Sequence, residues 1–169
     1  RGRWYARNRG VALFRRAADG ATWDSVDGFN DLPVRRTWCY DFSELTPDGA
    51  KCHSVQVHPA DAKRIALGLS GGGVCVSDDA GATWSPVNLG VAMDFAPPKA
   101  DGTEYEYGHD PHDMVIHPAN PDRWYHQNHC GIYRLDCKPG TQRRWVRIGE
   151  NMPKDVGDIG FPMTCHPRN

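Results

Sequence analysis

The sequence has no long hydrophobic run and almost no net charge. None of its apolar stretches approaches the roughly 20 residues that a membrane-spanning helix needs. Its 169 residues carry 20 Lys and Arg against 21 Asp and Glu, a net charge of −1, whereas a general nucleic-acid binder is usually basic. We therefore expect neither a membrane nor a nucleic acid as a partner.

Closely spaced cysteine pairs are also absent. The six cysteines, which form no C-x-x-C pair, are Cys39, Cys52, Cys75, Cys130, Cys137 and Cys165. Their spacing predicts neither a disulfide framework nor a cysteine-ligated zinc site. Several fall in predicted strands, where a free cysteine behaves as a small buried hydrophobe. Unpaired thiols favour a reducing compartment such as the cytoplasm, and they are the one indication of localisation.

Turn-forming residues are abundant, with 18 Gly and 13 Pro, and one turn phrase recurs. Residues 77–84 read S-x-D-x-G-x-T-W, and residues 18–23 are a less exact copy. Residues 135–140, followed by Trp145, form a third copy that is less exact still. Trp23, Trp84 and Trp145 stand at an equal spacing of 61 residues (84 minus 23, and 145 minus 84). A fixed period of this kind predicts a repeat architecture.

The residue types of this phrase suit a tight hairpin turn. Asp79 can accept hydrogen bonds from its own turn, Gly81 supplies a positive φ, and Trp84 can pack beneath the turn. We interpret the phrase as a structural clasp, with direct binding as the alternative. Its members are Ser77, Asp79, Gly81, Thr83 and Trp84, with Gly20, Thr22, Trp23 and Trp145 in the other copies. Ala18 and Cys137 replace the Asp in those copies, so we expect less rigid turns there.

A second repeat alternates with the first along the chain. The segments 53–59, 112–118 and 161–167 each end in His-Pro. After the first two come a polar turn, an apolar run, a glycine turn and another short apolar run. Short strands bounded by Gly, Pro, Asn and Asp are typical of hairpins. The order of strands A, B and C, the clasp and strand D predicts the four-stranded blade of a β-propeller.

The predicted fold is therefore all-β, a β-propeller of four-stranded antiparallel blades. We expect one partial domain over 1–169, with blade pieces near 1–30, 52–88, 112–148 and 160–169. Two blades are complete, the first lacks strand A, and the fourth has strand A alone. Because propellers close with about four to eight blades, we expect a fragment of a longer chain whose remaining blades are its partner.

The recurring phrase resembles the Asp-box, or BNR repeat, of sialidase-like β-propellers. Residues 127–134, 112–121 and 160–167 are similar to stretches of a bacterial BNR-repeat family labelled sialidase-like or glycosyl-hydrolase-like, so the resemblance covers nearly the whole chain. It implies a propeller that binds glycans and that, if it is an enzyme, is a glycoside hydrolase. The Arg-Ile-Pro motif of true sialidases is absent, which favours a neutral-glycan hydrolase or lyase, or a carbohydrate-binding propeller. The alternative is a non-catalytic scaffold for protein or ligand binding.

The strand order predicts which face holds the site. Three features share the face opposite the clasps: the start of strand A, the turn between strands B and C, and the end of the long loop from strand D to the next strand A (the D–A loop). Long loops on a rigid scaffold concentrate binding residues. The expected ligand-binding residues are His53, His112, Asn128, His129, Tyr105 and Tyr107. Glycoside hydrolysis normally needs two carboxylates, and the candidates are Asp110, Asp113, Glu104 and Glu106, with solvated loop charges as the alternative.

Histidines and carboxylates in the segment 108–113 also match the ligand preferences of Zn²⁺. A metal site there would use His109, His112 and His129. Against this, the side chains of a strand alternate between faces, so His126 and His129 need not converge. The histidines of the His-Pro pairs suit turn hydrogen bonds. The pattern therefore requires no cofactor.

Overall fold

The computed structural model describes residues 4–7, 11–38, 50–137 and 141–168. Its strands are β1 (Tyr5–Arg7), β2 (Leu13–Arg16), β3 (Trp23–Ser25), β4 (Cys52–Val57), β5 (Ile65–Leu69), β6 (Gly73–Ser77), β7 (Ser85–Pro86), β8 (Pro111–Ile116), β9 (Arg123–Asn128), β10 (Gly131–Asp136) and β11 (Val146–Arg147). Short helical turns are α1 (Asp27–Asn30), η1 (Pro33–Thr37) and η2 (Gly149–Asn151).

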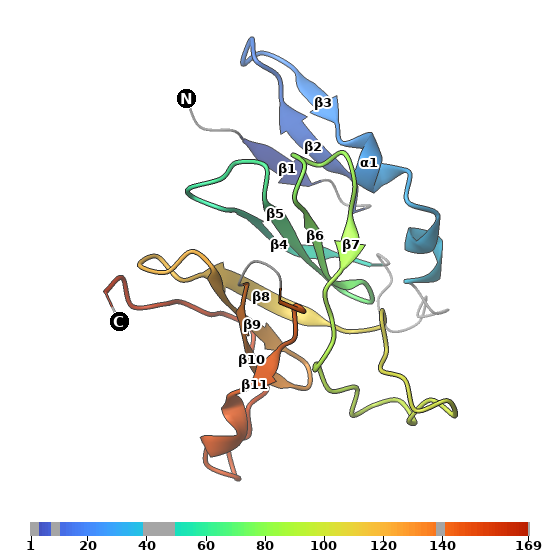
Figure 1. The fold of residues 1–169 in the computed structure, drawn as a ribbon, viewed down its shortest axis with the longest axis vertical. Coiled ribbons are helices and arrows are strands. Elements are labelled where there is room, and N and C mark those ends of the chain that lie inside the picture. Colours follow the sequence, from blue (N-terminus) through green and yellow to red (C-terminus); the bar gives the residue numbers. More distant parts are fainter. Residues whose placement is uncertain (1–3, 8–10, 39–49, 138–140, 169) are drawn as a thin grey trace.

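The strands form three separate antiparallel sheets, which fan out side by side (Figure 1). The first sheet has three strands, in the order β1-β2-β3, and the other two have four strands each: the second in the order β4-β5-β6-β7 and the third in the order β8-β9-β10-β11. Each four-stranded sheet is a meander in chain order, as a propeller blade requires. The chain is an all-β, partial β-propeller, which confirms the predicted fold. The three-stranded sheet has the pairing order expected of strands B, C and D of the first predicted blade.

Alternation along the central strands explains why the blades stack. Ile65, Leu67 and Leu69 of β5 pack into a core shared with the first sheet. Ala66 of β5 and Val74 of β6 join a second core, shared with the third sheet. Because successive side chains of a strand point to opposite faces, a sheet covered on both sides is apolar at every position. All five residues of β5 and all five of β6 are accordingly buried.

The complete clasp holds its own turn. The carboxylate of Asp79 accepts hydrogen bonds from the Thr83 amide (2.8 Å), the Thr83 hydroxyl (2.6 Å) and the Ser77 hydroxyl (2.8 Å). These bonds, led by that from the Thr83 hydroxyl, lower the pKa of Asp79 to about 2. Trp84 donates from its indole to the Gly81 carbonyl at 3.0 Å and is buried beneath the turn.

The other copies of the clasp depart from this pattern in different ways. In the first copy Asp19, one residue after Ala18, takes over as acceptor and receives the Ala21 amide at 2.8 Å and the Thr22 amide at 3.3 Å. The turn therefore keeps a carboxylate acceptor even though Ala18 occupies the usual Asp position. Trp23 is 47% exposed, unlike Trp84. In the third copy Trp145 is buried, while residues 138–140 lie outside the described part.

The His-Pro histidines cap the turns that follow them. The Nδ1 atom of His58 accepts the amides of Ala60 (3.2 Å) and Asp61 (3.1 Å). His117 repeats the arrangement, with the amides of Ala119 and Asn120 both at 3.1 Å. This confirms that these histidines serve the turns.

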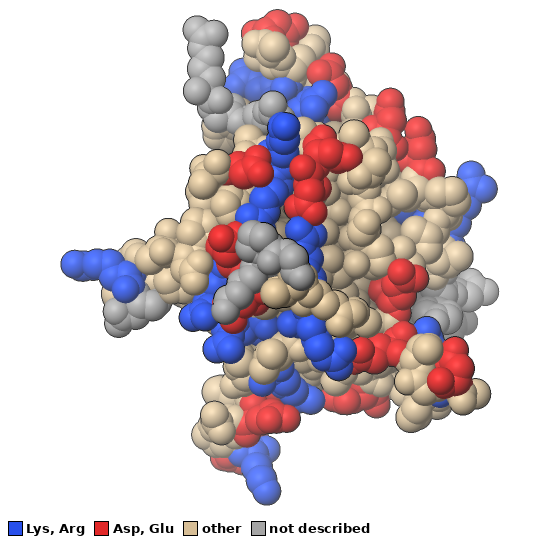
Figure 2. All heavy atoms as spheres, in the orientation of Figure 1, with Lys and Arg blue, Asp and Glu red and all other residues tan. Residues whose placement is uncertain are grey.

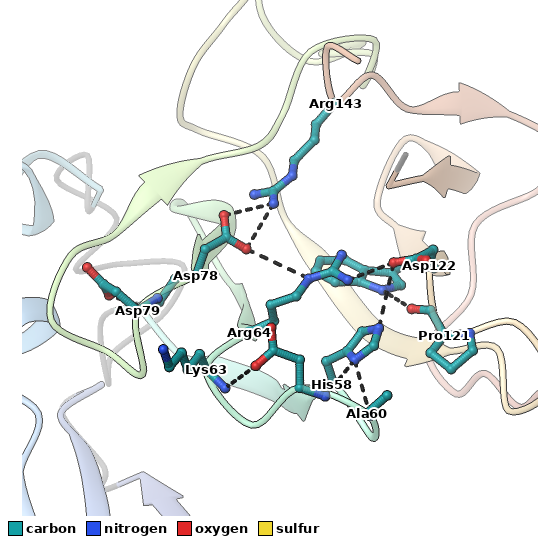
Figure 3. Close-up of polar contacts among 12 residues, drawn as sticks. His58, Ala60, Lys63, Arg64, Asp78, Asp79, Pro121, Asp122 and Arg143 are labelled. Atoms are coloured by element: carbon teal, nitrogen blue, oxygen red, sulfur yellow. Dashed lines mark hydrogen bonds and ion pairs between the residues drawn. The ribbon is translucent and has the colours of Figure 1, made fainter. Parts of the chain in front are cut away.

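A chain of ion pairs links the second and third sheets beside these turns (Figure 3). Arg64, between His58 and β5, contacts Asp122 at 2.6 Å and Asp78 at 3.8 Å. Arg143 contacts the same Asp78 at 2.8 Å. Because Asp78 points to the third sheet while Asp79 serves its own turn, neighbouring carboxylates have separate structural roles.

The C-terminal segment differs from the prediction of a fourth-blade strand A near 160–169. Residues 152–168 contain no strand. A strand needs a partner for its backbone groups, and the described residues place none beside this segment. It lies instead against the third sheet, where the Met163 amide donates to Asp113 at 3.0 Å and the Gln127 side-chain amide donates to the Asp158 carbonyl at 2.8 Å.

Surface charge is mixed in sign. Figure 2 shows Lys and Arg interspersed with Asp and Glu on the face seen in Figure 1. No helix within the described ranges is long and apolar enough to cross a membrane. None of the cysteines among the described residues forms a disulfide, and four of these five are buried.

The clasp generates the first prediction. Asp79→Ala should lower the melting temperature by several degrees, because three donors at one tight turn lose their acceptor. Asp79→Asn should lower it less, since one amide oxygen remains. Thermal denaturation followed by circular dichroism measures both, with the exposed Asp155→Ala as the matched control. An Asp79→Ala variant that melts like the wild type would show that the clasp does not stabilise the fold.

Candidate functional site

Two histidines occupy equivalent irregularities in neighbouring blades. In β4 the pairing steps from Cys52 opposite Leu69 to Ser54 opposite Gly68, so His53 is an extra residue. In β8 it steps from Pro111 opposite Asn128 to Asp113 opposite Gln127, so His112 is extra in the same way. Such β-bulges redirect a side chain and are common next to functional sites.

The bulges bring these histidines together with a third. The ring centroids of His53 and His112 are 6.4 Å apart, and those of His112 and His129 are 5.7 Å apart. His129 lies in the β9–β10 turn, where its amide donates to the Asp110 carbonyl at 3.1 Å. The side chain of Asp110 approaches His112, with 3.4 Å between Oδ2 and Nε2. We call Asp110, His112 and His129 the rim triad.

The rim triad lies at the predicted end of the blades. Its residues are at the start of β8 and in the β9–β10 turn, whereas the clasp follows the far end of β6, where Ser77 pairs with Ile65. The D–A loop between β7 and β8 reaches the same end, because its Gly108 amide donates to the carbonyl of Gly71 in the β5–β6 turn at 2.7 Å. Hydrogen bonds of the backbone thus gather the loop and both turns on one face.

Hydrogen bonding defines the ring orientation of His112. Its Nδ1 atom lies 2.7 Å from the Gly160 carbonyl, so it must donate, and Nε2 turns toward Asp110. The side chain of His112 is 5% exposed and that of Asp110 is 34% exposed. The Oδ1 atom of Asp110 is buried and has no hydrogen-bond partner among the described residues.

Two exposed phenylalanines border the rim triad. Phe161 stacks on the His112 ring, with centroids 4.3 Å apart and planes 8° from parallel, and is 68% exposed. Phe95 meets His129 edge-on at 5.9 Å and is 54% exposed. Sequence reasoning overlooked both. The signal for Phe161 was its place after Gly160 in a family-like stretch, but its contact with β8 depends on the tertiary fold.

The other candidate carboxylates have different surroundings. Glu104 forms a two-bond ion pair with Arg144, at 2.6 and 2.8 Å, which holds the pKa of Glu104 below its usual value. Asp113 accepts the amides of Met114 (2.8 Å) and Met163 (3.0 Å). Glu106 is exposed. The structure thus brings Asp110 to the imidazoles and gives Glu104 and Asp113 structural partners.

The remaining predicted ligand residues are engaged by other parts of the protein. Tyr105 donates its hydroxyl to the Pro97 carbonyl at 2.7 Å and lines a hollow of about 220 Å³ within the D–A loop. Tyr107 packs on Trp38, and burial raises its pKa to about 12. Asn128 is fully buried, and its side-chain oxygen accepts the Cys130 amide at 2.9 Å. These three residues support the loops around the rim.

Two further histidines are buried between the blades. His109, a candidate metal ligand, is 1% exposed, its Nε2 lies 3.0 Å from the Tyr105 carbonyl, and burial lowers its pKa. His126 is fully buried and stacks on Trp145 with centroids 4.2 Å apart. Burial lowers the pKa of His126 to about 3. His126 and His129 therefore lie in different environments.

Comparison with known proteins yields structural likeness alone. No family model matches the chain, and no curated protein matches it. Among solved structures, it is similar to the GH74 xyloglucanase of Xanthomonas campestris, at 17% sequence identity and a TM-score of 0.46. The match covers 80% of this chain and 18% of that structure, so this chain spans under a fifth of its length.

Burial of His126 generates a prediction about pH. The unfolded chain binds a proton at this imidazole near pH 6.5, but the folded protein resists it until about pH 3. The stability that the neutral, buried His126 contributes is therefore complete above about pH 6.5 and declines as the pH falls toward 3. Each pKa unit between the two states corresponds to about 1.4 kcal/mol, so acidification to pH 4 should cost a few kcal/mol.

Melting temperatures between pH 7 and pH 4 test this assignment. His126→Leu should flatten the pH profile, whatever its effect on absolute stability. The exposed His166→Leu is the matched control and should retain the slope of the wild type. An equally steep profile in His126→Leu would assign the acid sensitivity to other groups.

Proposed function

We propose that this propeller segment binds carbohydrate at the rim triad and its two bordering phenylalanines. The observation that carries the proposal is the exposed ring of Phe161, stacked on His112 beside Asp110. An exposed aromatic ring offers an apolar face to the C–H groups of a sugar. Imidazole and carboxylate groups next to it can hydrogen-bond the sugar hydroxyls.

The arrangement of the rim supports a neutral sugar over a sialylated one. The carboxylate of Asp110 stands at the site, and the nearby Arg147 is held by Asp158 through bonds of 2.8 and 2.9 Å. An anionic sugar would therefore meet a like charge at Asp110 and a guanidinium that is already paired. This favours a neutral-glycan ligand within the sialidase-like class.

Hydrolysis is a second step that the same site could support. Asp110 would supply one carboxylate, and a glycoside hydrolase normally needs another at about 5–5.5 Å or about 6.5–9.5 Å. Glu104 and Asp113 are engaged by Arg144 and by backbone amides. We therefore propose binding as the function of this segment, with catalysis dependent on a carboxylate beyond those two.

The test is binding to immobilised neutral and sialylated oligosaccharides. Phe161→Ala should weaken binding of the neutral sugars about tenfold, since an aromatic contact of about 1.4 kcal/mol corresponds to that factor. Phe95→Ala should weaken it by less, because that ring stands at the edge of the triad.

Trp4→Ala provides the matched control. Trp4 is 63% exposed but lies before β1 in the first sheet, so its removal should leave sugar binding unchanged. Equal binding by wild type and Phe161→Ala would refute the proposed platform. Binding restricted to sialylated sugars would overturn the preference for neutral glycans.

A further inference from the structure

The rim triad has the composition of a metal site. Two imidazoles and one carboxylate supply three ligand atoms, which lie within 4.8 Å of one another. Nitrogen and carboxylate oxygen are ligands for Zn²⁺ and related divalent transition metals. We propose that Asp110, His112 and His129 bind one such cation. This inference does not rest on carbohydrate binding, because metal binding can be measured without a sugar.

The spacing of two of the three ligand atoms agrees with tetrahedral coordination. Tetrahedral Zn²⁺ with bonds of about 2.0–2.1 Å separates its ligand atoms by about 3.4 Å. The Nε2 atom of His112 and Oδ2 of Asp110 are 3.4 Å apart. His129 is exposed in the β9–β10 turn, so a small rotation of its ring can complete the set.

The surroundings of His112 prepare it to act as a ligand. Metal-binding histidines usually donate their second ring N–H to a carbonyl or a carboxylate, which fixes the tautomer. Here Nδ1 donates to the Gly160 carbonyl at 2.7 Å, and Phe161 stacks on the ring at 4.3 Å. The ring is thus held in one plane, with the Nε2 lone pair directed at Asp110.

Two features of the triad favour a bound positive charge. With Nδ1 as the donor, a neutral His112 presents a lone pair to the carboxylate oxygen 3.4 Å away. The other oxygen of Asp110 is buried without a hydrogen-bond partner among the described residues. A buried carboxylate oxygen without a partner is costly. A proton on Nε2 would remove the contact between the lone pair and the carboxylate oxygen. A cation shared by both side chains would do this and would also stabilise the buried oxygen of Asp110.

The backbone places all three ligands before any ion arrives. The bulge redirects His112, and the His129 amide bonds to the Asp110 carbonyl at 3.1 Å. A ligand whose backbone is held by hydrogen bonds loses less freedom on binding, which favours affinity. Three protein ligands would leave at least one coordination position open.

The experiment is a titration of the chelator-treated protein with Zn²⁺, followed by calorimetry, and with Co²⁺, followed by visible absorption. One ion per chain should bind, and the visible absorption bands of bound Co²⁺ should indicate a low coordination number. His129→Ala and Asp110→Asn should each weaken binding at least about tenfold, because each removes or neutralises a ligand. His129 is exposed, so its variant should fold normally, as circular dichroism can verify.

The exposed His166→Ala is the matched control, since it removes an imidazole outside the triad. It should bind Zn²⁺ like the wild type. Unchanged affinity in both triad variants would overturn the proposal, as would a wild-type protein that binds neither ion. Sugar binding that persists after chelation would separate this site from the carbohydrate proposal.

Discussion

Double burial of the central strands is the constraint on which the structure depends. Each face of the second sheet is covered by a neighbour, so the alternate residues of β5 enter two different cores. Ile65, Leu67 and Leu69 pack toward the first sheet, and Ala66 packs toward the third. A sheet buried on both faces can place polar chemistry only at its ends. The propeller therefore confines its chemistry to the turns and loops at the two ends of the blades.

The two ends of the blades use polar residues for different purposes. At one end, Asp79 and His58 satisfy the amides of their own turns, and Arg64 links neighbouring sheets through Asp122. These groups are consumed by structure. At the other end, the bulges at His53 and His112 turn imidazoles toward one another, and part of Asp110 is left without a partner. Unsatisfied polar groups on a rigid frame are the property expected of a binding site.

Local sequence patterns predicted the frame well. Short apolar runs separated by glycine turns located the strands of both complete blades, because hairpin pairing is a local matter of alternation and turn chemistry. The first clasp shows the limit of that reasoning. Asp19 replaces the missing carboxylate at Ala18 one residue later, a shift that depends on the turn geometry. The predicted strand near 160–169 does not form over the described residues 160–168, because a strand also needs a neighbour.

The sequence by itself determined the all-β fold and the order of strands, and it predicts the end of the blades at which a site can form. It named His112, His129 and Asp110 as members of one face. Only the tertiary structure decided which of the candidates meet. Burial between sheets assigned His109 and His126 to the interior, and the ion pair with Arg144 engaged Glu104. The bulge redirected His112, and the return of the chain placed Phe161 on it. Such contacts join residues far apart in the chain, so no local pattern records them.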